Sequence, residues 1–117
     1  MTGNVMDMGR GDVRTFPHGT IQIARLGSIT VTRVSFEPGF RWTNDLRDVA
    51  GTDLCMVHHK GYAISGRLHV RMEDGSEFEI GPGQAHEIPP RHDGWVVGDE
   101  PYVAVDFSSD MERFAAT

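Results

Sequence analysis

The stretch from residue 55 to residue 97 constrains the fold most, because turn signals divide it into short apolar runs. Asp74-Gly75 favours a tight hairpin turn, Gly81-Pro82-Gly83 separates the next two runs, and Pro89-Pro90 follows the second of them. The runs between these signals have the length and composition of strands. The stretch also contains the only cysteine and every histidine except His18. We therefore expect a rigid sheet that positions these side chains around a pocket.

Alternating apolar residues predict two further strands from residue 20 onward, joined by a turn at Gly27-Ser28. In the second of them the apolar positions move from Val31 to Val34 and Phe36, a change of phase that a β-bulge produces. The other strands are expected near residues 53–58, 61–65, 67–72, 77–80, 84–88, 95–98 and 102–108. The charged segment NDLRDVAGTD is expected to form a loop at the mouth of the barrel. About nine short strands without a convincing amphipathic helix indicate an all-β sandwich or barrel.

A length of 117 residues predicts one domain. Residues 1–15 are polar and lack a period, which predicts a mobile N-terminal leader. The barrel domain is expected over residues 16–109. Residues 110–117 are expected to form a C-terminal tail with at most one helical turn.

The charge balance and the apolar content limit the partners that we expect. The net charge is −6 and no basic stripe is present, which disfavours nucleic-acid binding. No apolar run reaches the roughly 18 residues of a membrane span, and the N-terminus lacks the pattern of a signal peptide. A single cysteine cannot form an internal disulfide, which fits a cytoplasmic protein.

The segment GYAISGRLHV, followed by DGSEFEIGPGQAHEIPP, resembles the two sequence motifs of the cupin superfamily. Gly66 matches the glycine that ends the first motif, and Gly83 and Pro89 match the glycine and proline of the second. The resemblance extends over roughly residues 20–108. It implies a single-domain cupin-type jelly-roll β-barrel of about nine antiparallel strands, with a pocket inside.

The resemblance also implies positions for metal ligands. His59 stands where the family usually has a glutamate ligand. The paired histidines of the first motif would fall near Asp53 and Cys55, or at Asp45 and Arg47 when counted from Gly39. In the second motif Arg91 replaces a glycine and Gly94 replaces the histidine, while His92 lies two residues earlier.

These residue types suit a divalent metal, since imidazole and thiolate ligands favour zinc, iron and nickel, and carboxylates extend the choice to manganese. The candidate ligands are His59, His92, His86, Cys55 and Asp45. The alternatives are a hydrogen-bonded interior role for the histidines, a small buried apolar role for the cysteine and a solvated surface role for the aspartate. His69 lies opposite the apolar face of Leu68 and Val70, and we expect it to face solvent or to contact a ligand residue.

Four residues are candidates for contact with a small-molecule substrate: Trp42, Tyr62, Trp95 and Arg91. The aromatic residues would form a pocket wall, and core packing is their alternative role. Arg91 would bind a carboxylate through paired N–H donors, and a surface position is its alternative.

The leading functional hypothesis is a small cupin with a metal-binding or small-ligand-binding barrel pocket. If it is an enzyme, it would be a metal-dependent oxygenase or isomerase that acts on a small organic acid or a carbonyl compound. The alternative is a metal-free module that binds or senses a small molecule with degenerate ligands. We also expect a homodimer built on the strands of residues 20–36, because a long exposed edge tends to pair with another chain.

Overall fold

The computed structural model describes residues 3–114 and contains two antiparallel sheets. Their strands are β1 (Asp12–Phe16), β2 (Gly19–Leu26), β3 (Ile29–Phe36), β4 (His59–Ser65), β5 (Arg67–Met72), β6 (Glu77–Ile80), β7 (Ala85–Ile88), β8 (His92–Val97) and β9 (Tyr102–Asp106). The helical segments are α1 (Trp42–Asp45), α2 (Arg47–Ala50) and the 3-10 helices η1 (Met8–Arg10) and η2 (Ser109–Phe114).

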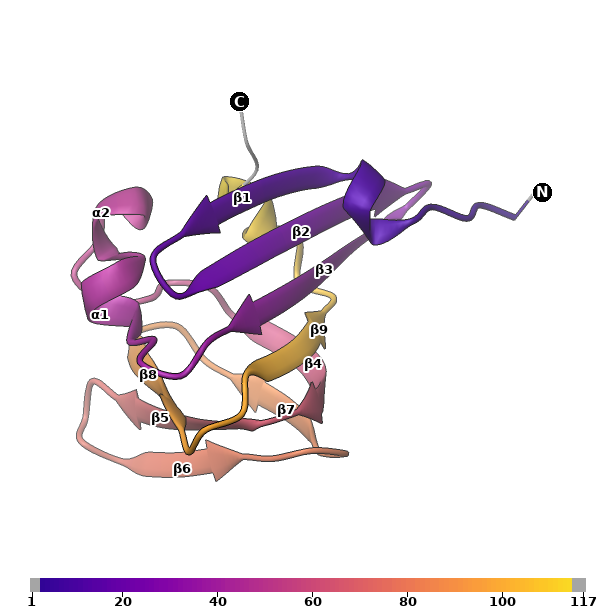
Figure 1. The fold of residues 1–117 in the computed structure, drawn as a ribbon. Coiled ribbons are helices and arrows are strands. Elements are labelled where there is room, and N and C mark those ends of the chain that lie inside the picture. The colour runs from indigo at the N-terminus through magenta and orange to yellow at the C-terminus, as the bar shows by residue number, and fades with distance from the viewer. Residues whose placement is uncertain (1–2, 115–117) are drawn as a thin grey trace.

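One sheet has six strands in the order β1-β2-β3-β9-β4-β7, and the other has three in the order β6-β5-β8. Figure 1 shows β1, β2 and β3 on one side of the molecule and β5, β6 and β8 on the other, with α1 and α2 at one end. Strand β9 pairs with both β3 and β4, so it joins the N-terminal strands to the histidine-bearing strands. This arrangement confirms the predicted all-β jelly roll with nine antiparallel strands.

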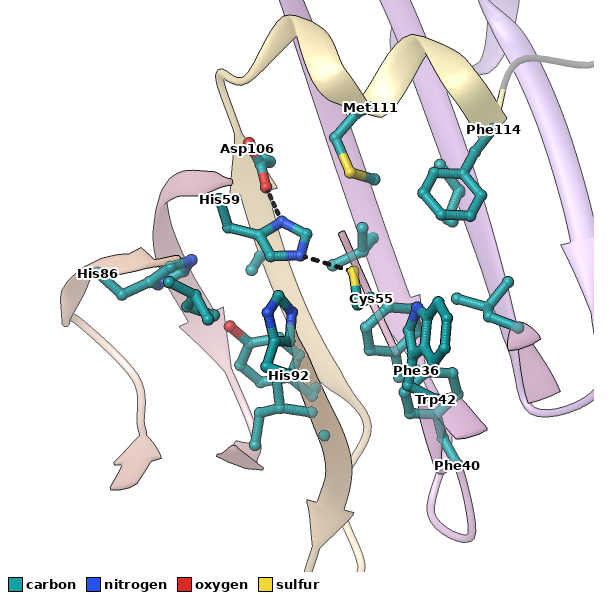
Figure 2. A pocket seen from close by; sticks show the side chains of 18 of the residues that line it. Phe36, Phe40, Trp42, Cys55, His59, His86, His92, Asp106, Met111 and Phe114 are labelled. Atoms are coloured by element: carbon teal, nitrogen blue, oxygen red, sulfur yellow. Dashed lines mark hydrogen bonds and ion pairs between the residues drawn. The ribbon is translucent and has the colours of Figure 1, made fainter. Parts of the chain in front are cut away.

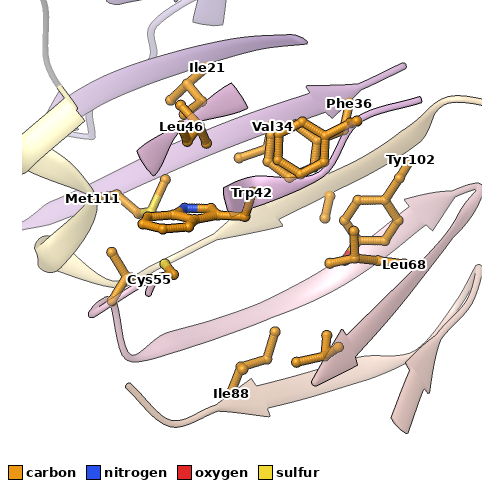
Figure 3. Packing of buried hydrophobic residues seen from close by; sticks show 14 of the residues in the cluster. Ile21, Val34, Phe36, Trp42, Leu46, Cys55, Leu68, Ile88, Tyr102 and Met111 are labelled. Atoms are coloured by element: carbon orange, nitrogen blue, oxygen red, sulfur yellow. The ribbon is translucent and has the colours of Figure 1, made fainter. Parts of the chain in front are cut away.

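The core lies between the two sheets, where alternate residues of each strand point inward. Ile21 of β2 and Val34 of β3 face it from the six-stranded sheet, and Leu68 of β5 faces it from the three-stranded sheet (Figure 3). The rings of Phe36 and Phe40 stack with centroids 3.9 Å apart, an arrangement that contributes about 0.5–1.5 kcal/mol beyond the buried area.

The predicted β-bulge in the strand of residues 29–36 was wrong. The ladders from β3 to β2 and to β9 both run without a shift in register. Thr32 is the buried residue at the expected bulge, and Val31 lies on the opposite face. A polar residue at an inward position therefore hid the regular alternation. The register shift lies in β4 instead, between Ala63 and Ser65.

Two expected segments have a different structure. The range 53–58 is not a strand; only Cys55 forms an isolated bridge, with His92. The expected charged loop, residues 44–53, contains α2 and the end of α1. Trp42 and Leu46 are four residues apart and both are buried, as expected on one face of a helix. A single helical turn is too short to give a clear helical period in the sequence.

The N-terminal part of the barrel begins earlier than expected. Residues 12–16, most of which were assigned to the leader, form β1 and pair with β2. Its Arg14 donates from Nε to the Phe114 carbonyl at 2.8 Å. A charged side chain on the half-buried face removed the apolar alternation that would have revealed this strand. Residues 1–2 of the predicted leader and 115–117 of the predicted tail lie outside the described residues.

Arg91 has a left-handed backbone conformation, with φ of 76°. This conformation costs a residue with a Cβ about 1–2 kcal/mol, and the ion pair of Arg91 with Glu73 at 3.5 Å joins two exposed side chains and contributes little. We therefore expect Arg91→Gly to raise the free energy of unfolding by about 0.5–1 kcal/mol in urea titrations. The gain is smaller than the strain that is removed, because glycine has more conformational entropy in the unfolded chain. Arg91→Lys should leave the free energy of unfolding unchanged. Unfolding of the glycine variant at a lower urea concentration than the wild type would contradict the expectation.

Candidate metal site

Three residues from separate segments converge inside the barrel. Cys55 lies in the loop after α2, His59 begins β4 and His92 begins β8. Their potential ligand atoms all lie within 4.8 Å of one another. Figure 2 shows the cysteine sulfur beside the rings of His59 and His92, whose centroids are 5.1 Å apart.

The orientation of His59 is fixed by Asp106, the last residue of β9. The Nδ1 of His59 lies 2.5 Å from the Asp106 carboxylate, which can only accept when it is ionised, so Nδ1 carries a proton. The other nitrogen, Nε2, lies 3.6 Å from the Cys55 sulfur. A carboxylate behind a histidine in this way is the arrangement that orients histidine ligands at metal sites.

The orientation of His92 is fixed by the backbone. Its Nδ1 donates to the carbonyl oxygen of Pro89 at 2.8 Å, because a carbonyl oxygen can only accept. The proton on Nδ1 leaves Nε2 as the nitrogen with a free lone pair. Both histidines therefore present Nε2 as the atom able to bind a metal.

The separation of two of the donor atoms fits a tetrahedral metal. Zinc–sulfur and zinc–nitrogen bonds of the usual lengths place a thiolate and an imidazole nitrogen about 3.6 Å apart in a tetrahedron. The sulfur of Cys55 and Nε2 of His59 have this separation. Three protein ligands would leave a fourth position open, as in catalytic zinc sites.

Hydrogen bonds within this cluster change the pKa values of Cys55 and His59. Burial raises the pKa of the Cys55 thiol, but the hydrogen bonds with His59 and His92 outweigh burial and bring it to about 6. Burial lowers the pKa of His59, but the hydrogen bonds with Asp106 and Cys55 outweigh it and bring the pKa to about 9. These opposite shifts in pKa favour a thiolate beside an imidazolium when no metal is bound, and a metal would replace the proton on Nε2 of His59.

A cavity of about 50 Å³ adjoins these side chains. Its wall is mostly aromatic and aliphatic, with residues from both sheets and from the helical segments. These are Ile21, Val34, Phe36, Phe40, Trp42, Leu46, Leu68, Ile88, Gly94, Tyr102, Ala104, Val105, Met111 and Phe114, together with Cys55, His59, His86, His92 and Asp106. No lysine or arginine of residues 3–114 belongs to this lining.

No family model matches the sequence, and no curated protein is significantly similar to it. Solved structures are similar to it. KdgF from Halomonas sp. aligns with a TM-score of 0.62 and 24% identity over 94% of this chain and 99% of that chain. Oxalate decarboxylase from Lactobacillus farciminis, in complex with formate, aligns with a TM-score of 0.62 and 18% identity over 86% of this chain. Oxalate decarboxylase from Bacillus subtilis, a protein with Mn(II) centres, has a TM-score of 0.56 and 23% identity over the same share.

These neighbours share one architecture. The chain has the cupin fold. It spans 31% and 28% of the two oxalate decarboxylases, and their similarity establishes the fold alone. Among residues 3–114, no helix of the chain is long and apolar enough to cross a membrane.

The cupin barrel brings some of the predicted residues together and separates others. His59, His92 and Cys55 converge, whereas Asp45 lies elsewhere. Its carboxylate accepts from the Arg41 backbone N–H at 3.0 Å and contacts His18 at 3.1 Å, so it holds the first turn of α1. His86 lines the cavity but is not among the three clustered residues.

Of the four predicted substrate contacts, only Trp42 lines the cavity. Tyr62 is next to the buried Ala63 on β4, so it points outward and is 46% exposed. Trp95 follows Gly94 on β8 and faces the outer side of its sheet, where it stacks on His69. Arg91 lies at the surface beside Glu73. Strand alternation explains the placement of Tyr62 and Trp95.

His69 lies on the outer face of the three-stranded sheet. Its Nε2 contacts Glu77 at 2.8 Å, and its ring stacks on Trp95 with centroids 4.8 Å apart. This placement agrees with its expected position opposite Leu68 and Val70.

Asp106 belongs to the candidate site and was not predicted from the sequence. It is buried and shares the inward face of β9 with Tyr102 and Ala104, two residues apart each. An acidic residue at an inward position of a strand was the signal that could have revealed it. Met111 and Phe114 of η2 were also missed, because the tail in which they lie has no strand pattern.

Proposed function

We propose that this cupin binds one divalent metal ion through Cys55, His59 and His92, and that it binds a small molecule at the open position facing the cavity. The convergence of three donor atoms within 4.8 Å, with both histidines held by hydrogen bonds at Nδ1, carries the proposal. Two histidines that lie close together by chance need not both be held at Nδ1 and so leave the same nitrogen, Nε2, for a metal.

The donor set favours zinc, iron(II) or nickel. One thiolate and two imidazoles are softer ligands than carboxylates and water, which suit manganese. The Bacillus subtilis oxalate decarboxylase has Mn(II) centres, and we propose that Cys55 shifts the preference of this chain away from manganese. A bound metal supplies a Lewis acid that polarises a carbonyl or lowers the pKa of water.

The lining of the cavity limits the classes of substrate that could bind. No arginine or lysine among the described residues lines the cavity, so a buried carboxylate would have the metal as its single cationic partner. We therefore favour a compound with few heavy atoms that binds the metal through one oxygen, such as a neutral carbonyl or enol compound or a small monocarboxylate, in a reaction of the oxygenase or isomerase type. The aromatic wall would exclude water from the reacting atoms, and Asp106 would hold His59 in place.

A metal-free binding module is the second candidate. The observation that favours it is the contact between Cys55 and His59, which satisfies both polar groups without a metal. In that case the apolar cavity would bind a small molecule by packing alone.

Cobalt(II) titration tests the proposal. Protein purified without a His-tag and treated with a chelator should bind one cobalt(II) and develop a thiolate-to-cobalt charge-transfer band, since Cys55 is the only cysteine. Cys55→Ser should lose this band. Zinc, iron(II) and nickel should bind more tightly than manganese in calorimetric titrations. If no metal binds tightly, or if the serine variant keeps the band, the metal-free module replaces the metal site.

We further propose a homodimer, but through a different edge from the one expected. Strands β2 and β3 are covered on both sides by β1 and β9, so residues 20–36 offer no free edge. The free edge of this side of the sheet is β1, where Val13 is 40% exposed. Light scattering at tens of micromolar should give twice the chain mass, and Val13→Lys should shift it towards one chain. A monomeric wild type would disprove the dimer.

We also propose a cytoplasmic location. The support is Cys55, which is a buried free thiol in the structure and must stay reduced to bind a metal.

A further inference from the structure

His86 has a position beside the candidate metal site without being part of the three-residue cluster. On β7 it pairs with Gly61 of β4, and Gly61 also pairs with Asp106 of β9. Paired residues of neighbouring strands point to the same face, so His86 and Asp106 face the interior from the two sides of Gly61. Figure 2 shows His86 to one side of His59 and His92.

Gly61 makes room for the His86 ring. A Cβ at this position would lie 2.9 Å from Nε2 of His86 and 2.3 Å from the Val105 carbonyl oxygen. The imidazole therefore lies over a residue without a side chain. This placement holds the ring against the sheet and inside the cavity wall.

The other ring nitrogen of His86, Nδ1, is buried and makes no hydrogen bond of good geometry within residues 3–114; the backbone of Gln84 lies near the ring and acts to raise the pKa of His86, but less than burial lowers it. Buried polar atoms in native proteins nearly always have a partner, because an unpaired one costs stability. Since the same ring lines the cavity, the molecule that fills the cavity is the available partner.

His86 also lines a second hollow on the outside of the barrel. This groove of about 420 Å³ lies between β6 and β7, which are edge strands of different sheets and do not pair with each other. The His86 ring therefore belongs to the wall that separates the interior cavity from solvent.

We propose that His86 donates a hydrogen bond from Nδ1 to the small molecule at the open metal position, where the cavity adjoins the groove between β6 and β7. The inference rests on the proposed metal site. It assigns His86 to the recognition of an acceptor atom, such as a carbonyl oxygen, instead of to the metal. Burial, and after it the charge of His59, lower the pKa of His86, which agrees with a neutral donor.

Azide is the probe, because it binds to open positions of metal ions, has only three atoms and accepts hydrogen bonds. Its affinity is measured by absorption in the cobalt(II)-loaded wild type, His86→Phe and His86→Gln. The control is His69→Phe, the same substitution on the outer face of β5. Zinc affinity is measured for each variant by competition with a chelator.

We expect His86→Phe to weaken azide binding by about tenfold or more, since a hydrogen bond to a charged acceptor is lost. His86→Gln keeps an N–H donor and should stay within about threefold of the wild type, as should His69→Phe. Zinc affinity should be unchanged in all three, which also shows that they are folded.

Two results would overturn the inference while the metal site stands: unchanged azide affinity in His86→Phe, or a loss of zinc affinity in His86→Phe and His86→Gln comparable with that of His59→Ala. A wild type that binds no metal would refute the proposed function first, and the inference with it.

Discussion

Replacing His59 by alanine should lower the zinc affinity of the chelated protein by about a hundredfold or more. The change removes one of three ligands, and loss of a group that only orients a ligand already costs about 10–100-fold. It also removes the imidazolium that stabilises the thiolate of Cys55, so burial would then dominate and raise the pKa of the thiol. Competition titration against a chelator at constant pH measures the effect.

Two other variants make the comparison specific. His69→Ala changes a histidine on the outer face of β5 and should bind zinc as the wild type does. Asp106→Asn keeps the shape of the side chain behind His59 but removes its charge, and should lower the affinity by about tenfold. If His59→Ala binds zinc as tightly as the wild type, His59 is not a ligand.

Gly66→Ala should destabilise the barrel by at least about 3 kcal/mol, which is a large part of the stability of a small domain. Gly66 lies between β4 and β5 with φ of 73°, and a Cβ there would lie 2.2 Å from the Pro101 carbonyl oxygen. Backbone atoms surround the position, so the clash cannot be relieved by rotating a side chain. Urea denaturation followed by circular dichroism measures the loss.

Gly51 is the matched control for this prediction. Its φ is 75°, almost the same as that of Gly66, but a Cβ would meet no atom within 4 Å. Gly51→Ala should therefore cost only the conformational strain, about 1–2 kcal/mol. Equal losses for the two alanine variants would show that strain alone, without the clash, accounts for the role of Gly66.

The turn residues explain why the fold could be predicted from sequence. Gly66 and Gly83 both have positive φ, and Asp74-Gly75 forms the hairpin between β5 and β6 with φ of 90° at the glycine. Such positions favour glycine whatever the surrounding side chains are, because a residue with a Cβ adopts them only at a cost. The motif resemblance rested on two of them, which is why it identified the fold more securely than the ligands.

The site could be predicted only in part, because ligand convergence depends on geometry between distant strands. His59 and His92 were predicted one at a time, but nothing local indicates that both rings present Nε2 to the same point. That depends on Asp106 and on the Pro89 carbonyl. Cys55 was expected on a strand and lies in a loop instead, held to the barrel by a bridge with His92.

This bridge has a consequence for the folding of the protein. The backbone carbonyl of Cys55 accepts from the Arg91 N–H at 2.7 Å, and the backbone N–H of Cys55 donates to the His92 carbonyl at 2.8 Å. The loop around Cys55 is not part of a strand of either sheet. Bringing residues 55 and 92 together closes a long loop of the chain, and this costs conformational entropy when the protein folds. A metal held by Cys55 and His92 would act as a covalent-like staple across that loop, in a chain that has no disulfide to serve the purpose.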